Sequence, residues 1–146
     1  GMSSAASDVY KRQILNNIIP STTGAAKAVG RVVPELDGIL TGMAYRVPTS
    51  NVSVVDFSVN LKKSTTMNEI SSIILNASKD KYKGVIGFCD EDLVSTDFNG
   101  DTRTSIFDKN ASLQITPHFF KLVCWYDNET GYSHKLIEMA RHMFGR

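Results

Sequence analysis

The sequence has little cysteine, no long apolar run and almost no net charge, and each shortage excludes a class of protein. Two cysteines in 146 residues do not make a disulfide framework. No apolar stretch approaches the roughly 20 residues of a membrane-spanning helix, and the N-terminus has no apolar segment typical of a secretory signal. A net charge of +1 gives no strong attraction to nucleic acid or to a membrane surface. We therefore expect a cytoplasmic protein that binds neither nucleic acid nor membrane.

Several motifs that carry chemistry are also missing. The sequence contains neither a G-x-G-x-x-G nor a G-K-[S/T] nucleotide-binding loop. The three histidines show no metal-ligand spacing with the cysteines. Cys124 lies in the apolar run Leu122–Trp125, and Cys89 precedes the acidic residues Asp90–Asp92, so neither has the electropositive, exposed setting of a reactive thiolate. We predict no metal site and no catalytic nucleophile.

What is present is an ordinary globular composition, with 42% hydrophobic and 21% charged residues. The length fits one domain that buries roughly two-thirds of its unfolded surface. Residues 1–13 differ from the rest, because Gly1-Met2 resembles a cloning scar and Ser3–Ser7 is small and polar. We expect residues 1–13 to be a cloning-derived or non-native tail and residues 14–146 to form the domain.

The periodicity of apolar residues predicts an α+β fold. Helices are predicted after Thr22-Thr23-Gly24, after the capping box Thr66–Glu69, and at 130–144. Strands are predicted at 39–47, 51–61, 85–89 and, as a central strand, 119–126. A bulge or a change of buried face is predicted near Val55, and a hairpin or tight turn at Asn99-Gly100 between 94–96 and 104–107. Because strands outnumber helices and follow one another, we expect a mainly antiparallel or mixed sheet with helices on one face.

Three local patterns are candidate binding sites, and each has a simpler alternative. Ser21–Gly24 places hydroxyl and N–H groups at a helix start, which suits an anion or is an ordinary helix cap. Arg46 ends a predicted strand, and its guanidinium either makes a bidentate contact with a phosphate or is solvated at the surface. Asn128 offers an amide donor and acceptor that suit another amide, or belongs to an Asx turn.

Long collinear motifs between residues 17 and 144 closely resemble the phosphorylating glyceraldehyde-3-phosphate dehydrogenases. These motifs are Asn17–Gly30, Pro34–Leu36, Leu40–Ala44, Arg46–Thr49, Asn51–Asp56, Val94–Asp101, Ser105–Asp108 and Trp125–Glu129. The resemblance implies the α+β catalytic domain of that family, with its large sheet and helices on one side. It also implies a part in glycolysis, where the family uses NAD and inorganic phosphate to oxidise glyceraldehyde 3-phosphate to 1,3-bisphosphoglycerate.

The resemblance also assigns roles to five residues. It implies that Thr23 and Gly24 bind a phosphate and that Arg46 binds the substrate phosphate region. It implies that Asn128 holds the nicotinamide amide of NAD and that Tyr132 borders the nicotinamide pocket. A phosphate-bearing small molecule is therefore the expected ligand.

The departures from the family are as informative as the matches. The motif S-C-T-T-N-C, which carries the family's cysteine nucleophile, and the segment H-A-Y-T, which carries its base histidine, are not found, nor is the Rossmann domain. We therefore expect a catalytic domain truncated at its N-terminal side that is inactive alone, with no catalytic residue and no tight binding of NAD. The alternative is a non-enzymatic interaction or oligomerisation module. In either case we expect a homo-oligomer formed through the sheet face.

Overall fold

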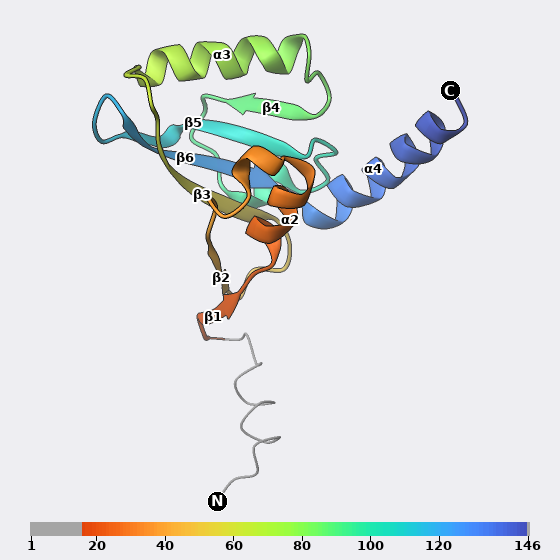
Figure 1. Ribbon diagram of the computed structural model, residues 1–146. Coiled ribbons are helices and arrows are strands. Elements are labelled where there is room, and N and C mark those ends of the chain that lie inside the picture. The colour runs from red at the N-terminus through yellow and green to blue at the C-terminus, as the bar shows by residue number, and fades with distance from the viewer. Residues whose placement is uncertain (1–15, 146) are drawn as a thin grey trace, which may run out of the picture. The chain divides into compact units, whose positions relative to one another are not determined.

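The computed structural model describes residues 16–145, and the chain divides after Ser50 into two compact units. Figure 1 shows their elements by label. The tail expected at residues 1–13 lies outside the described residues. Both units combine helices with β-strands, so the predicted α+β class is confirmed. No Rossmann domain, with its alternating strands and helices, occurs within residues 16–145.

The first unit contains a two-stranded antiparallel ribbon and a helix. Its elements are β1 (Ile19–Thr22), α2 (Ala25–Val32), the 3-10 helix η1 (Pro34–Leu36) and β2 (Met43–Arg46). The predicted helix is confirmed, whereas the strand predicted over 39–47 pairs only at its second half. Gly38 has a φ of 73°, which ends the 3-10 turn before that strand begins. Strand β1 was not predicted, and Pro20 within it is typical of an edge strand rather than a central one.

The second unit contains a four-stranded mixed sheet in the order β3-β6-β5-β4. The strands are β3 (Ser53–Asn60), β4 (Ile86–Cys89), β5 (Ser105–Gln114) and β6 (Phe119–Tyr126). β6 pairs antiparallel with both β3 and β5, while β4 and β5 are parallel. The prediction of a mainly antiparallel or mixed sheet with an interior strand at 119–126 is confirmed.

Helix α3 (Met67–Lys79) covers one face of this sheet at β4 and β5 (Figure 1). Its predicted capping box is present, with the Thr66 side chain accepting from the Glu69 N–H and the Glu69 carboxylate accepting from the Thr66 N–H. Gln114 fixes the helix start, because its Oε1 accepts from the Met67 N–H at 3.0 Å. Gln114 pairs with Phe120, which is fully buried, so the helix and Phe120 share a face.

The opposite face of the sheet carries a second small core. Phe98 stacks on Trp125 with ring centroids 5.5 Å apart, and the cluster also contains Val52, Cys89, Leu93 and Ile106. Phe98 belongs to the 3-10 helix η2 (Ser95–Phe98), which occupies the place of the first strand of the predicted hairpin. The tight turn predicted at Asn99-Gly100 is present, with a φ of 79° at Gly100, but it does not join two hairpin strands, because the residues before it form η2.

Of the two alternatives predicted near Val55, a bulge or a change of buried face, the bulge is wrong. The pairing of β3 with β6 runs in unbroken register from Ser53 to Asn60. The backbone irregularity lies at Val52, one residue before β3 begins, where φ is 66° and the side chain is buried. The irregularity of the sheet lies instead in β5, where the register shifts between Asp108 and Leu113.

Helix α4 (Asn128–Met143) begins directly after β6 and extends away from the sheet (Figure 1). Its apolar side chains at helical spacing are exposed, with Tyr132 at 67% and Met143 at 75%. The amphipathic pattern therefore predicts the helix correctly, but its apolar stripe is not buried against the described part of the chain. Within residues 16–145, no helix has the length and apolar character required to cross a membrane.

Candidate functional site

Thr23 and Gly24 form the turn between β1 and α2. The Thr23 Oγ1 accepts a hydrogen bond of 3.2 Å from the Ala25 N–H, so Thr23 orders the first turn of the helix. Gly24 is the N-cap residue, and a Cβ built on it would meet nothing within 4 Å. The N–H groups of a first helical turn have no partners inside the helix. The start of α2 is therefore an open position with exposed donors and the positive end of the helix dipole.

Arg46 lies at the other end of the same ribbon. It pairs with Ile19, whereas Thr22, the residue before Thr23, pairs with Met43. Residues paired across antiparallel strands share a face, and so do residues two apart, which places Ile19, Arg46 and, one residue beyond β1, Thr23 on one face. Four residues separate Ile19 from Thr23, or roughly 13 Å at the rise of a strand. One phosphate can contact both Thr23 and Arg46 only if the Arg46 side chain extends along the ribbon toward Thr23.

The side chain of Arg46 is exposed and makes no ion pair or hydrogen bond within residues 16–145. Its five N–H donors therefore have no protein acceptor in that part of the chain. The simpler interpretation of Arg46, a solvated surface residue, fits this exposure as well as a binding role does. The ribbon favours the binding role, because its register places the Arg46 and Thr23 side chains on the same face.

Asn128 is the first residue of α4, and Asp127 is its N-cap. The Asp127 carboxylate accepts from the N–H groups of Glu129 and Thr130 at 3.1 Å and 2.9 Å, which is an Asx-type cap. Asn128 is exposed, and its side-chain amide makes no hydrogen bond within the described residues. Tyr132 lies four residues on and therefore projects from the same side of the helix. The Asx turn expected as the alternative role is thus performed by Asp127, which leaves the Asn128 amide unengaged.

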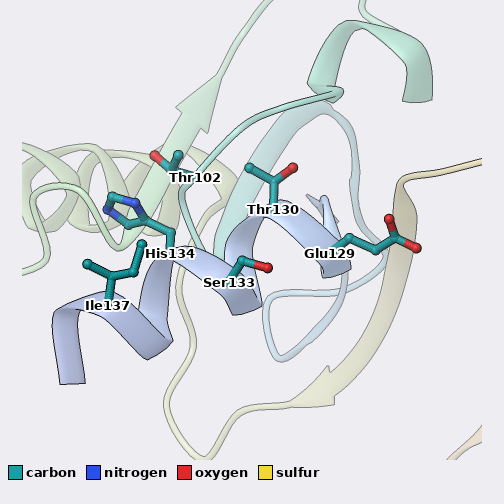
Figure 2. A pocket seen from close by; sticks show the side chains of 6 residues that line it. All are labelled: Thr102, Glu129, Thr130, Ser133, His134 and Ile137. Carbon is teal, nitrogen blue, oxygen red and sulfur yellow. The ribbon is translucent and has the colours of Figure 1, made fainter. Parts of the chain in front are cut away.

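A shallow pocket lies beside these residues, between α4 and the loop before β5 (Figure 2). It is lined by Thr102, Glu129, Thr130, Ser133, His134 and Ile137. Neither Asn128 nor Tyr132 lines it. The His134 ring lies 3.1 Å from the Glu138 carboxylate, and the Lys135 ammonium lies 2.5 Å from it. The hydrogen bond from Lys135 is the main reason why the pKa of Glu138 is lowered. The histidine of this pocket is thus already paired with Glu138.

Neither cysteine is a candidate nucleophile. Burial raises the pKa of the Cys89 thiol, and the nearby carboxylates of Asp108 and Glu91 raise it further. Burial also raises the pKa of Cys124, whose strand runs through the interior of the sheet. Neither cysteine therefore has the electropositive, exposed environment that lowers the pKa of a reactive thiolate.

The two cysteines also cannot pair with one another. Cys89 in β4 pairs with Asp108, which pairs with Val123, the neighbour of Cys124 in β6. Successive residues of a strand point to opposite faces, so the thiols lie on opposite sides of the sheet. Two strand spacings separate their backbones by about 10 Å, which is beyond the reach of a disulfide. Within the described residues there is also no cluster of side chains suited to hold a metal ion.

The five residues singled out from the sequence fall into two groups. Thr23, Gly24 and Arg46 belong to the ribbon and helix of residues 16–50, and Asn128 and Tyr132 belong to α4. The residue that the sequence analysis missed is Asp127. Its signal was present, since Asp is a preferred N-cap residue, but it was hidden in the polar run Asp127–Glu129.

Comparison with known proteins agrees with these motifs. A family described as "Glyceraldehyde 3-phosphate dehydrogenase, C-terminal domain" matches residues 3–128, which include most of the expected tail. The chain is 59% identical over 127 residues to the glyceraldehyde-3-phosphate dehydrogenase of Shimwellia blattae and 56% identical to glyceraldehyde-3-phosphate dehydrogenase A of Escherichia coli. It is 58% identical to the barley (Hordeum vulgare) glyceraldehyde-3-phosphate dehydrogenase 2, whose name includes "cytosolic".

Each of these matches covers 87% of this chain, but the chain spans only 38% of the two bacterial relatives and 42% of the barley protein. The family match covers far more than half of the chain, and all three relatives align over the same large share of it. On these grounds the chain belongs to the glyceraldehyde-3-phosphate dehydrogenase family, as a member of its C-terminal domain.

Proposed function

We propose that this chain supplies the substrate-phosphate side and part of the nicotinamide side of a glyceraldehyde-3-phosphate dehydrogenase active site. The observation that carries the proposal is the placement of Thr23 and Arg46 on one face of the β1–β2 ribbon, with the guanidinium unengaged by the described residues. Identities of 56–59% to dehydrogenases support the same assignment. The whole enzyme's reaction is the oxidation and phosphorylation of glyceraldehyde 3-phosphate, and this chain contributes binding to it.

The phosphate chemistry follows from the groups at the start of α2. The Thr23 hydroxyl accepts from Ala25 and so still has its own O–H to donate. Gly24 leaves room for a phosphate oxygen to approach the N–H groups of the first turn. Arg46 adds a charge-assisted contact of the kind that is about twice as strong as a neutral hydrogen bond. Together these groups suit the phosphate of a small metabolite.

The nicotinamide side depends on Asn128 and Tyr132. A side-chain amide with an unengaged donor and acceptor fits the carboxamide of nicotinamide, and an exposed tyrosine ring beside it offers an apolar wall. NAD, when bound, accepts the hydride of the oxidation. Two residues on one helix bind a dinucleotide only weakly, so we propose that this chain alone does not hold NAD tightly.

We further propose that the 146-residue chain alone has no dehydrogenase activity. Its two cysteines both have raised pKa values, so neither supplies the thiolate that covalent catalysis requires. The test is an absorbance assay for NADH with glyceraldehyde 3-phosphate, NAD and phosphate, run beside a full-length relative. Production of NADH by the chain alone would refute this part of the proposal.

The binding part is tested separately with inorganic phosphate. Titration followed by NMR is expected to shift the backbone amide signals of Gly24 and Ala25, and Arg46→Ala is expected to weaken the binding at least tenfold. Arg31→Ala is the matched control, because Arg31 is also a basic residue of the same unit but lies in the last turn of α2. Equal weakening by the two variants would indicate general attraction of anions rather than a site.

We also propose a homo-oligomer formed through the sheet face and a cytoplasmic location. Val55 and Phe57 are 43% and 40% exposed on β3, at the opposite edge of the sheet from β4. Adjacent exposed apolar side chains of this kind favour association. Light scattering of the chain and of Phe57→Lys tests this, since the variant is expected to have the lower mass. The name of the barley relative supports the location.

A further inference from the structure

Asp127 connects three segments that are far apart in the sequence. Its side chain is almost fully buried, with an exposed fraction of 1%. Oδ2 accepts from the Asn51 side-chain amide at 2.8 Å and from the Gly100 N–H at 2.9 Å. Oδ1 accepts from the N–H groups of Thr130 and Glu129 at the start of α4. One carboxylate therefore joins the segment before β3, the loop before β5 and the first turn of α4.

This buried charge is stabilised without an ion pair. Within the described residues no lysine or arginine bonds to Asp127, and the fifth donor to its carboxylate is the Thr130 hydroxyl at 3.1 Å. Neither carboxylate oxygen is therefore without a donor. The Thr130 and Gly100 N–H groups, with smaller contributions from the Thr130 hydroxyl and Asn51, lower the pKa of Asp127 to about 2. The carboxylate is thus fully ionised at neutral pH.

The loop that Asp127 holds lies close to α4. A Cβ built at Gly131 would come within 3.5 Å of the Arg103 carbonyl oxygen, so the helix backbone approaches the loop at that point. Gly100 has a φ of 79°, a conformation that turns its N–H toward Asp127 and that other residues rarely adopt. The contact is therefore built into the backbone of both segments.

We propose that Asp127 is the positioning residue for Asn128. By anchoring the first turn of α4 to two other segments, it fixes the direction in which the Cα–Cβ bond of Asn128 points and, one turn later, that of Tyr132. A helix cap alone would allow α4 to pivot, because α4 makes little contact with the sheet. The consequence for nicotinamide binding depends on the proposed function, whereas the fixed direction of Asn128 does not.

The variant Asp127→Asn separates the cap from the anchor. Asparagine is as good an N-cap residue as aspartate, so its carbonyl oxygen still accepts from the first turn of α4. Its NH₂ group replaces Oδ2 and faces the Gly100 N–H, which can only donate, whereas the Asn51 amide can turn its carbonyl oxygen toward the new NH₂ group. Glu129→Gln is the control, since it removes a neighbouring charge and keeps the backbone N–H.

The experiment measures backbone ¹⁵N order parameters of the full 146-residue chain, with no ligand added. Asn128 is expected to be rigid, at about 0.85, and to fall below about 0.6 in Asp127→Asn, values typical of rigid and flexible backbone. Glu129→Gln is expected to show no such loss. An unchanged order parameter at Asn128 in Asp127→Asn, with the Gly100 amide signal displaced, would overturn the proposal.

Two further measurements keep the outcome decisive. If Asp127→Asn does not fold, Asn51→Ala keeps both cap bonds and removes one anchoring donor. Its Asn128 order parameter is expected to fall below that of Glu129→Gln, and equality would also overturn the proposal. Titration with NADH tests nicotinamide binding separately, because it is expected to shift the NMR signal of the Asn128 side-chain amide in the unmutated chain. Absence of that shift would contradict the proposed function and leave the positioning result standing.

Discussion

The indole Nε1 of Trp125 donates a hydrogen bond of 2.8 Å to Oδ2 of Asp108, a residue that is only 3% exposed. The other oxygen of that carboxylate accepts from the Ala111 N–H within the irregular part of β5. Trp125 thus does two things, since its ring also stacks on Phe98. The hydrogen bond connects β6 with β5 where the sheet register shifts.

Replacing Trp125 by phenylalanine keeps an aromatic ring against Phe98 but leaves one oxygen of Asp108 buried without its donor. We expect a loss of about 1–3 kcal/mol in the free energy of unfolding, the usual cost of an unsatisfied buried group. Urea unfolding followed by circular dichroism measures it. Tyr126→Phe is the control, because the Tyr126 hydroxyl makes no hydrogen bond within the described residues and its removal should change stability by less than about 0.5 kcal/mol. Equal effects would contradict the expectation.

The elements that the sequence predicted well are those whose signals are local. The capping box Thr66–Glu69 specifies the start of α3 by hydrogen bonds between residues three apart. The tight turn signalled by Asn99-Gly100 is present, but the residues before it form η2 rather than a strand, and their Phe98 packs on Trp125 from a distant part of the chain. At Val52 the alternation of apolar residues indicates a change of buried face nearby, but it does not predict the φ of 66° found there.

The candidate site follows the same rule. Thr23 and Arg46 were visible in the sequence as separate weak signals, each with an ordinary alternative. Their common face depends on the register of β1 with β2, and β1 itself was not predicted. The role of Asp127 depends on Asn51 and Gly100, which lie 76 and 27 residues away. Contacts at that separation come from the fold and not from a local motif.

The acid stability of the protein should depend on Asp127. Its pKa is lowered from an ordinary value near 3.9 to about 2 in the fold. A lowered pKa contributes stability that is fully present above the unfolded value and is lost as the pH falls toward the folded value. We therefore expect the difference in unfolding free energy between the unmutated chain and Asp127→Asn to be constant from pH 7 to about 5 and to shrink below about 4. Urea unfolding at several pH values measures it, and a difference independent of pH down to 2.5 would contradict it.

The thiols should be unreactive while the chain is folded. Burial and nearby carboxylates raise the pKa of Cys89, and burial raises that of Cys124, so little thiolate is present near neutral pH. We expect iodoacetamide at pH 7.5 to label both at least tenfold more slowly than it labels free cysteine, and to label both fully in urea. Mass spectrometry of peptides distinguishes the two positions. Rapid labelling of either thiol in the folded chain would reopen the question of a nucleophile.

Gly30 should be required for packing despite its position inside a helix. In α2 alanine normally stabilises relative to glycine by about 1 kcal/mol. A Cβ built on Gly30, however, would lie 2.8 Å from Oδ1 of Asp37 and 3.0 Å from its Cα. Since the backbone at Asp37 must shift, and overpacking typically costs about 1–3 kcal/mol, we expect Gly30→Ala to destabilise the chain overall. Gly42→Ala is the control, because its Cβ would meet only Thr23 at an ordinary 3.9 Å. Urea unfolding should therefore place Gly30→Ala below the unmutated chain and Gly42→Ala close to it, and a stabilised Gly30→Ala would show that α2 and Asp37 separate easily.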